Sequence, residues 1–202
     1  MCWNATASLS AFISGIIICL TIGSISYYQK KYELMALSIG WIYVIFMQFW
    51  EFLIWKYPNN KLYVDMTYLF NITQISILGL IFLTFFTNQP KMGRFFIFFV
   101  LIFYICFFSY QTCHRNEITH QSGHLEYNWW GNPYSSYIYI FSLILIFLCI
   151  IRPFWWSMST LLIILLFLLL SRIFYSKSVA SMWCFFAVSV PLFSFLMSLL
   201  TY

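Results

Sequence analysis

The chain has 202 residues, of which 63% are hydrophobic and only 7% are charged, and its formal net charge at pH 7 is +5. Soluble domains carry about 25% charged residues, so this composition excludes an ordinary soluble domain. The ten lysines and arginines form no run, and nucleic-acid binding therefore lacks the basic patch that it requires.

Long apolar runs occupy most of the chain, and each is predicted to cross a membrane, because a span needs about 20 mainly apolar residues. The runs are continuous rather than alternating, which favours helices over a barrel. The seven predicted spans, in chain order, are 7–27, 34–55, 64–87, 94–112, 136–151, 155–175 and 179–200. No basic segment precedes the first run, so we interpret it as a retained span rather than a signal peptide.

The linkers between these spans are short, apart from one polar loop over about 113–135. Short linkers make consecutive helices antiparallel neighbours and leave no room for a second domain. We therefore predict an all-α fold in which residues 1–202 form one polytopic membrane domain, a bundle of seven transmembrane helices.

Two of the spans contain residues that influence helix packing. The first is rich in small residues, which permit close approach of another helix; they are Ser10, Ser14, Gly15 and Gly23. In the seventh, Pro191 frees a backbone carbonyl and predicts a kink.

A lone carboxylate, Glu51, lies inside the second span. An ionisable group at bilayer depth costs roughly 2.5–3.5 kcal/mol on insertion scales and is a functional-site hypothesis by default. Gln48, Glu51 and Trp55 share one helical face, and Asn71 and Gln74 share a face of the next helix. At about 1.5 Å rise per residue, the two groups differ in depth by about one turn. The sequence therefore predicts a hydrogen-bonded cluster between the second and third spans.

Two roles for this cluster stay open. Burial favours the protonated form of a carboxyl group, and a protonatable group beside amides is what a proton relay or cation site needs. In the alternative, the amides hold the helices together, with about 1 kcal/mol for each interaction. In that case Glu51 can also lie at the interface, where it reaches water or pairs with Lys56 or Lys61.

All three histidines lie in the polar loop, at positions 114, 120 and 124. A helix there would place four zinc or copper donors on one face, at i, i+4, i+7 and i+11; these are Cys113, Glu117, His120 and His124. Against this, Ser122-Gly123 favours a turn. The alternative is a polar loop whose histidines are solvated or bonded to Glu117 and Glu126.

Two of the six cysteines, Cys2 and Cys113, lie outside the apolar runs. Four spans separate them, so both lie on the same side of the membrane in either orientation. If that side is lumenal or extracellular, a disulfide between them is permitted. The other four cysteines are predicted to be packing residues.

The basic residues of the chain give almost no preference for either orientation of the bundle in the membrane. With the N-terminus outside, five basic residues lie inside and five outside, so the positive-inside rule gives a tie. We favour an outside N-terminus, which places the sequon Asn4-Ala5-Thr6 in the lumen. Seven helices also invite comparison with retinal proteins, but Lys177 lies at the mouth of the last span, and no retinal Schiff base is expected.

Short motifs occur along the chain: Met1-Cys2-Trp3 at the start, Gln48 to Trp55 in the second span, Gly123-His124-Leu125 in the loop and Trp183-Cys184 near the end. In this order they resemble an uncharacterised multi-pass membrane family of bacteria, algae and large DNA viruses, whose members begin Met-Cys-Trp. Gln74-Ile75 departs from the Gln-Pro of that family. The resemblance implies a multi-pass fold and a viral or protist source, and it names no reaction.

The leading functional hypothesis is a channel-like or transporter-like protein that binds or conducts a small ion, proton or solute between its helices. Glu51 would carry the charge, with Gln48, Asn71 and Gln74 lining the path. Its expected partners are the lipid bilayer and the small ion or solute, and homo-oligomerisation stays open. Two alternatives are a metal-binding membrane enzyme acting through residues 113–124 and a non-catalytic receptor-like or envelope protein.

Overall fold

Helices make up most of the computed structural model, which describes residues 4–85, 91–112, 118–121, 124–127, 133–150, 154–174, 183 and 186–201. The helices in these segments are α1 (Ala5–Tyr28), α2 (Tyr32–Lys56), α3 (Lys61–Phe85), α4 (Lys91–Thr112), α5 (Pro133–Ile150), α6 (Phe154–Phe174) and α8 (Val190–Thr201). Two short strands, β1 (Ile118–Gln121) and β2 (His124–Tyr127), lie between α4 and α5 in the chain.

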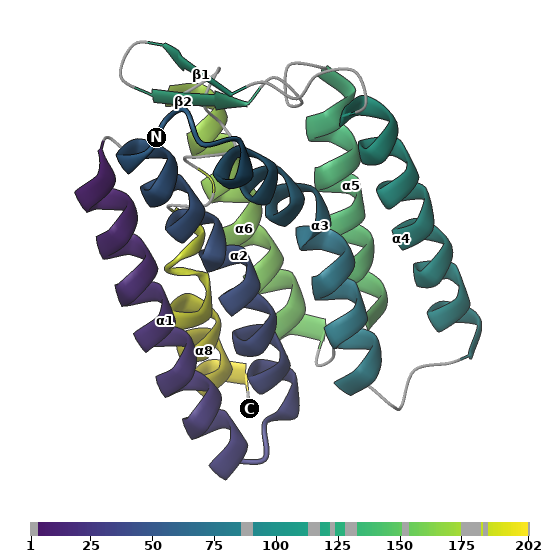
Figure 1. Ribbon diagram of the computed structural model, residues 1–202. Coiled ribbons are helices and arrows are strands. Elements are labelled where there is room, and N and C mark those ends of the chain that lie inside the picture. Colours follow the sequence, from purple (N-terminus) through teal and green to yellow (C-terminus); the bar gives the residue numbers. More distant parts are fainter. Residues whose placement is uncertain are drawn as a thin grey trace.

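The helices form one bundle, and the two strands lie across one of its ends (Figure 1). Helix α2 is central, because it packs against α1, α3 and α8. Its large side chains are accordingly among the most deeply buried in the protein, including Leu37, Trp41 and Ile45. Helices α4 and α5 pack against α3 and against each other, and α6 packs against α5 and α8.

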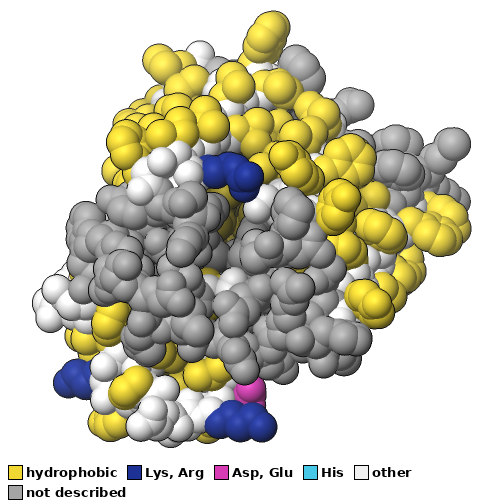
Figure 2. All heavy atoms as spheres, turned by 90° about the horizontal axis from the view of Figure 1, so that it is seen from above, with side chains coloured by type: hydrophobic (Ala, Val, Ile, Leu, Met, Phe, Trp, Pro, Cys, Tyr) yellow, Lys and Arg dark blue, Asp and Glu magenta, His cyan; other side chains and the backbone are white. Residues whose placement is uncertain are grey.

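Four of the helical segments are long and apolar enough to cross a membrane: Ala5–Tyr28, Tyr32–Lys56, Lys61–Phe85 and Trp155–Phe174. In the described part of α4, α5 and α8 the apolar stretches are shorter, at Ile97–Tyr110, Tyr134–Leu148 and Val190–Leu200. Among the described side chains seen from the hairpin end, hydrophobic ones predominate and charged ones are few (Figure 2). The helical, membrane-compatible character predicted from composition is thus confirmed, whereas the count of seven spans is not.

The last predicted span, 179–200, is not one continuous helix. The described residues form a turn at Val188 and Ser189, after which α8 begins at Val190. Pro191 therefore lies in the first turn of a helix, where its missing N–H is not needed. The predicted kink is a complete break.

A tryptophan from α2 stabilises this break. In a continuous helix the carbonyl of Ala187 would accept a bond from residue 191, but proline has no N–H. Instead, the indole Nε1 of Trp41 donates to the Ala187 carbonyl oxygen at 2.7 Å. Both residues are fully buried, so the indole satisfies a group that water does not reach.

We expect Trp41→Phe to lower the thermal stability of the protein. The change leaves the Ala187 carbonyl buried without its donor, which costs about 1–3 kcal/mol. Thermal unfolding of purified protein in detergent measures the effect. Trp155→Phe is the matched control, because Trp155 is 72% exposed, and equal melting temperatures of the two variants would contradict the prediction.

The close approach predicted for the first span is confirmed between α1 and α2. A Cβ atom added to Gly15 would lie only 2.9 Å from Cδ1 of Ile45, so this position tolerates no larger residue without movement. Gly15 therefore lets the two helices pack closely, whereas Ser10 and Ser14 are exposed.

The strands β1 and β2 pair antiparallel, with Ile118 opposite Tyr127 and Gln121 opposite His124. Successive side chains on a strand alternate between faces, so Leu125 and Tyr127 point the same way. Both are buried, which means that this face of β2 packs onto the protein. The all-α prediction missed this hairpin, and the hairpin proves to position the site described next.

Candidate functional site

Glu51 lies on α2 inside the bundle, near the end that carries the hairpin. It is five residues from the end of the helix at Lys56, a depth of about 8 Å at the usual helical rise. The exposed fraction of its side chain is 0%. A carboxyl group is thus fully enclosed in a protein whose composition is that of a membrane protein.

Both carboxyl oxygens of Glu51 accept a hydrogen bond. The amide Nε2 of Gln48, one turn away on the same helix, donates to Oε2 at 3.1 Å. The hydroxyl of Tyr127 donates to Oε1 from strand β2. These two donors are electrically neutral, and one of them ties the hairpin to the centre of the helical bundle.

A second group of hydrogen bonds joins α3 to α5. Oε1 of Gln74 accepts from the hydroxyl of Tyr139 at 3.1 Å. The Tyr139 oxygen in turn accepts from the indole Nε1 of Trp183 at 2.9 Å. Asn71, one turn from Gln74 on α3, is buried as well. Polar side chains of α2, α3 and α5 therefore occupy the interior of an otherwise apolar bundle.

All four residues predicted for the pathway are enclosed. Gln48, Glu51 and Gln74 are 0% exposed and Asn71 is 1% exposed. The interpretation that Glu51 reaches water at the interface is therefore wrong for this structure. Lys56 is exposed, and its Nζ lies 5.6 Å from the centre of the Phe52 ring.

Sequence reasoning missed the two tyrosine partners of these residues, Tyr127 and Tyr139, and the indole of Trp183 that donates to Tyr139. Helical spacing could not reveal them, because Tyr127 is 76 residues from Glu51 and Tyr139 is 65 residues from Gln74. The available signal was indirect: a buried carboxylate requires donors, and the alternation of Leu125 and Tyr127 is typical of a strand with one buried face.

The structure does not contain the helix that the metal-site hypothesis for the polar loop assumed at His120 and His124. His120 and His124 lie on the paired strands β1 and β2, so they share no helical face. Cys113 and Glu117 lie outside the described residues, and the disulfide predicted between Cys2 and Cys113 lies outside them too. Among the residues that are described, no cluster of three or more histidine, cysteine, aspartate or glutamate side chains could hold a metal ion. Zinc or copper binding here stays a prediction.

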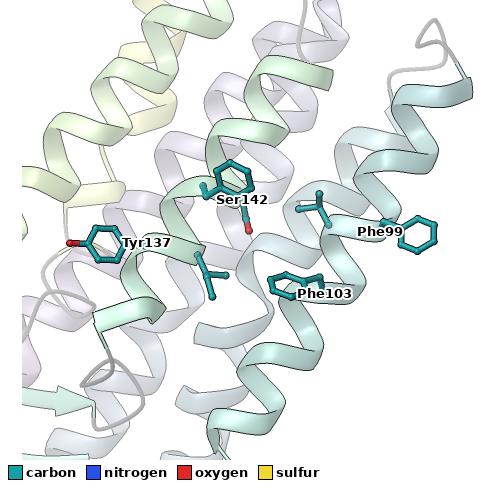
Figure 3. Close-up of a pocket in the computed structure, with 7 residues that line it drawn as sticks. Phe99, Phe103, Tyr137 and Ser142 are labelled. Atoms are coloured by element: carbon teal, nitrogen blue, oxygen red, sulfur yellow. The ribbon is translucent and has the colours of Figure 1, made fainter.

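A cavity of about 560 Å³ lies away from Glu51, between α4 and α5. Phe99 and Phe103 line it from α4, and Tyr137 and Ser142 from α5 (Figure 3). Its wall is almost wholly apolar, and none of the four predicted pathway residues lines it. This cavity is therefore separate from the buried polar side chains around Glu51.

No protein-family model, curated protein or solved structure matches this chain. The geometry around Glu51 is consequently the basis for a functional assignment.

Proposed function

We propose that this is an integral membrane protein whose seven helices cross the bilayer and which transfers a proton through the bundle, with Glu51 as the proton-carrying group. The observation that supports the proposal is the burial of the Glu51 carboxyl at 0% exposure, with hydrogen bonds from Gln48 and Tyr127.

The energetic argument starts from the cost of burying charge. Moving an ionised carboxylate out of water costs roughly several kcal/mol of solvation free energy. Neutral hydrogen-bond donors offset only part of that cost. The carboxyl is therefore favoured in its protonated form while it is enclosed and in its ionised form when water reaches it. A group that changes protonation with access to water is the central requirement of a proton carrier.

The residues around Glu51 have distinct roles in this proposal. Gln48 orients the carboxyl group, and Asn71 and Gln74 provide polar contacts deeper in the bundle. In this proposal the hairpin covers the site through Tyr127 and holds it closed. Release of that contact would open the site toward the hairpin side of the membrane.

The test is proton flux into lipid vesicles that contain the purified protein. With a pH-sensitive dye inside the vesicles, an imposed pH gradient should collapse faster than in protein-free vesicles, and the rate should depend on Glu51. Rates equal to those of protein-free vesicles at every pH would overturn the proposal.

A further inference from the structure

A second buried phenol lies beside Tyr139. Tyr104, on α4, is 0% exposed, and its ring centre is 6.4 Å from that of Tyr139. Among the residues that the structure describes, its hydroxyl has no hydrogen-bond partner. The same holds for the hydroxyl of Ser76 on α3, which is also buried.

The packing of α3 against α4 brings the backbones of these two residues to about the same depth. A Cβ atom added to Gly79 would lie 2.7 Å from Cδ2 of Leu101, so these two residues are in contact. Because the helices are antiparallel, Ser76 and Tyr104 each lie three residues from this contact in the direction of the hairpin end. Tyr104 thus lies where α4 meets α3 and α5, beside the Tyr139 that is bonded to Gln74.

Unpaired buried hydroxyls require an explanation, because each carries a desolvation cost without a compensating bond. Water is the ligand that fits them best, since a hydroxyl can both donate to it and accept from it, and buried waters typically bond two to four polar groups. Gln74 and Tyr139 add further polar atoms at the same junction. The junction therefore contains enough partners for a water molecule.

We propose that the junction of Tyr104, Gln74 and Tyr139 is an internal water site that carries the proton from Glu51 deeper into the bundle. This inference rests on the proposed function. The water accepts one proton and releases another, so no side chain at the junction changes its charge. Because Tyr104 is 0% exposed, the water enters when side chains shift during the transport cycle.

The first test is the proton flux of Tyr104→Phe, which should fall about tenfold, the factor that corresponds to one lost hydrogen bond. Tyr110→Phe is the control on the same helix, because Tyr110 is 68% exposed, and its flux should match that of the unmodified protein. An unchanged flux for Tyr104→Phe, alongside normal flux of the unmodified protein, would overturn the inference and leave the proposed function standing.

The second test is thermal unfolding, which does not require a measurement of proton flux. Tyr104→Phe removes an unpaired hydroxyl, so its melting temperature should equal or exceed that of the unmodified protein. Tyr139→Phe loses its bonds to Gln74 and Trp183 and should melt several degrees lower. An equal loss of stability in both variants would mean that the Tyr104 hydroxyl has a protein partner, which contradicts a water site. An absence of flux in the unmodified protein would instead refute the proposed function itself.

Discussion

Replacing Glu51 with glutamine should abolish the pH-dependent proton flux and leave the bundle folded. Glutamine has nearly the same shape, and its amide oxygen can still accept the hydrogen bond from Tyr127. It has no proton to release near neutral pH, so the carrier step is lost. Flux in reconstituted vesicles should then fall to the level of protein-free vesicles.

The matched control is Asp65→Asn. Asp65 is exposed on the first turns of α3, at the same end of the bundle as Glu51. Both substitutions remove one carboxylate, so an effect on surface charge alone would appear in both. We expect normal flux for Asp65→Asn, and intact flux for Glu51→Gln would refute the role of Glu51.

A fold measurement separates loss of transport from loss of structure. A buried neutral amide is cheaper to enclose than a carboxylate, so the melting temperature of Glu51→Gln should be unchanged or higher. A lower melting temperature would mean that the ionised carboxylate and its donors hold the bundle together, which favours the structural alternative.

The sequence could predict those residues of the site that follow helical periodicity. Gln48 and Glu51 recur at i, i+3 on a helix that the apolar pattern identifies, and Asn71 and Gln74 do the same on the next. Burying such groups costs free energy, so they must face the interior. The structure confirms the burial of all four.

The rest depended on contacts between distant segments. The donor to Glu51 comes from a strand in a loop that apolar periodicity does not describe. Likewise, Pro191 alone does not distinguish a kink from a break. The outcome depends on whether another residue satisfies the freed Ala187 carbonyl, and Trp41 of α2 does so. The local pattern of apolar and polar residues does not identify partners that are so far apart in the chain.

Removing the hydroxyl of Tyr127 with Tyr127→Phe should weaken the attachment of the hairpin to α2 and increase the rate of proton entry. A hydrogen bond to a neutral carboxyl group contributes about 0.5–1.5 kcal/mol, and its loss lowers the barrier to exposing Glu51. The hairpin itself should persist, because Leu125 on the same face of β2 stays fully buried.

A double-mutant cycle tests the contact directly. Glu51→Ala, which removes the acceptor, Tyr127→Phe and the double variant are compared by unfolding free energy. A direct hydrogen bond predicts a coupling of about 0.5–3 kcal/mol, whereas zero coupling would contradict it. Tyr57→Phe is the control, because Tyr57 is 55% exposed between α2 and α3, and its coupling with Glu51→Ala should be close to zero.

The direction of the change in flux decides what Tyr127 does. If the phenol only holds the site closed, its removal exposes Glu51 more often and proton entry becomes faster. If its hydroxyl instead passes the proton to Glu51, the same variant loses a step of the path and entry becomes slower. The closed hairpin favours the first result, because Tyr127 is 3% exposed and has little contact with water from which to take a proton.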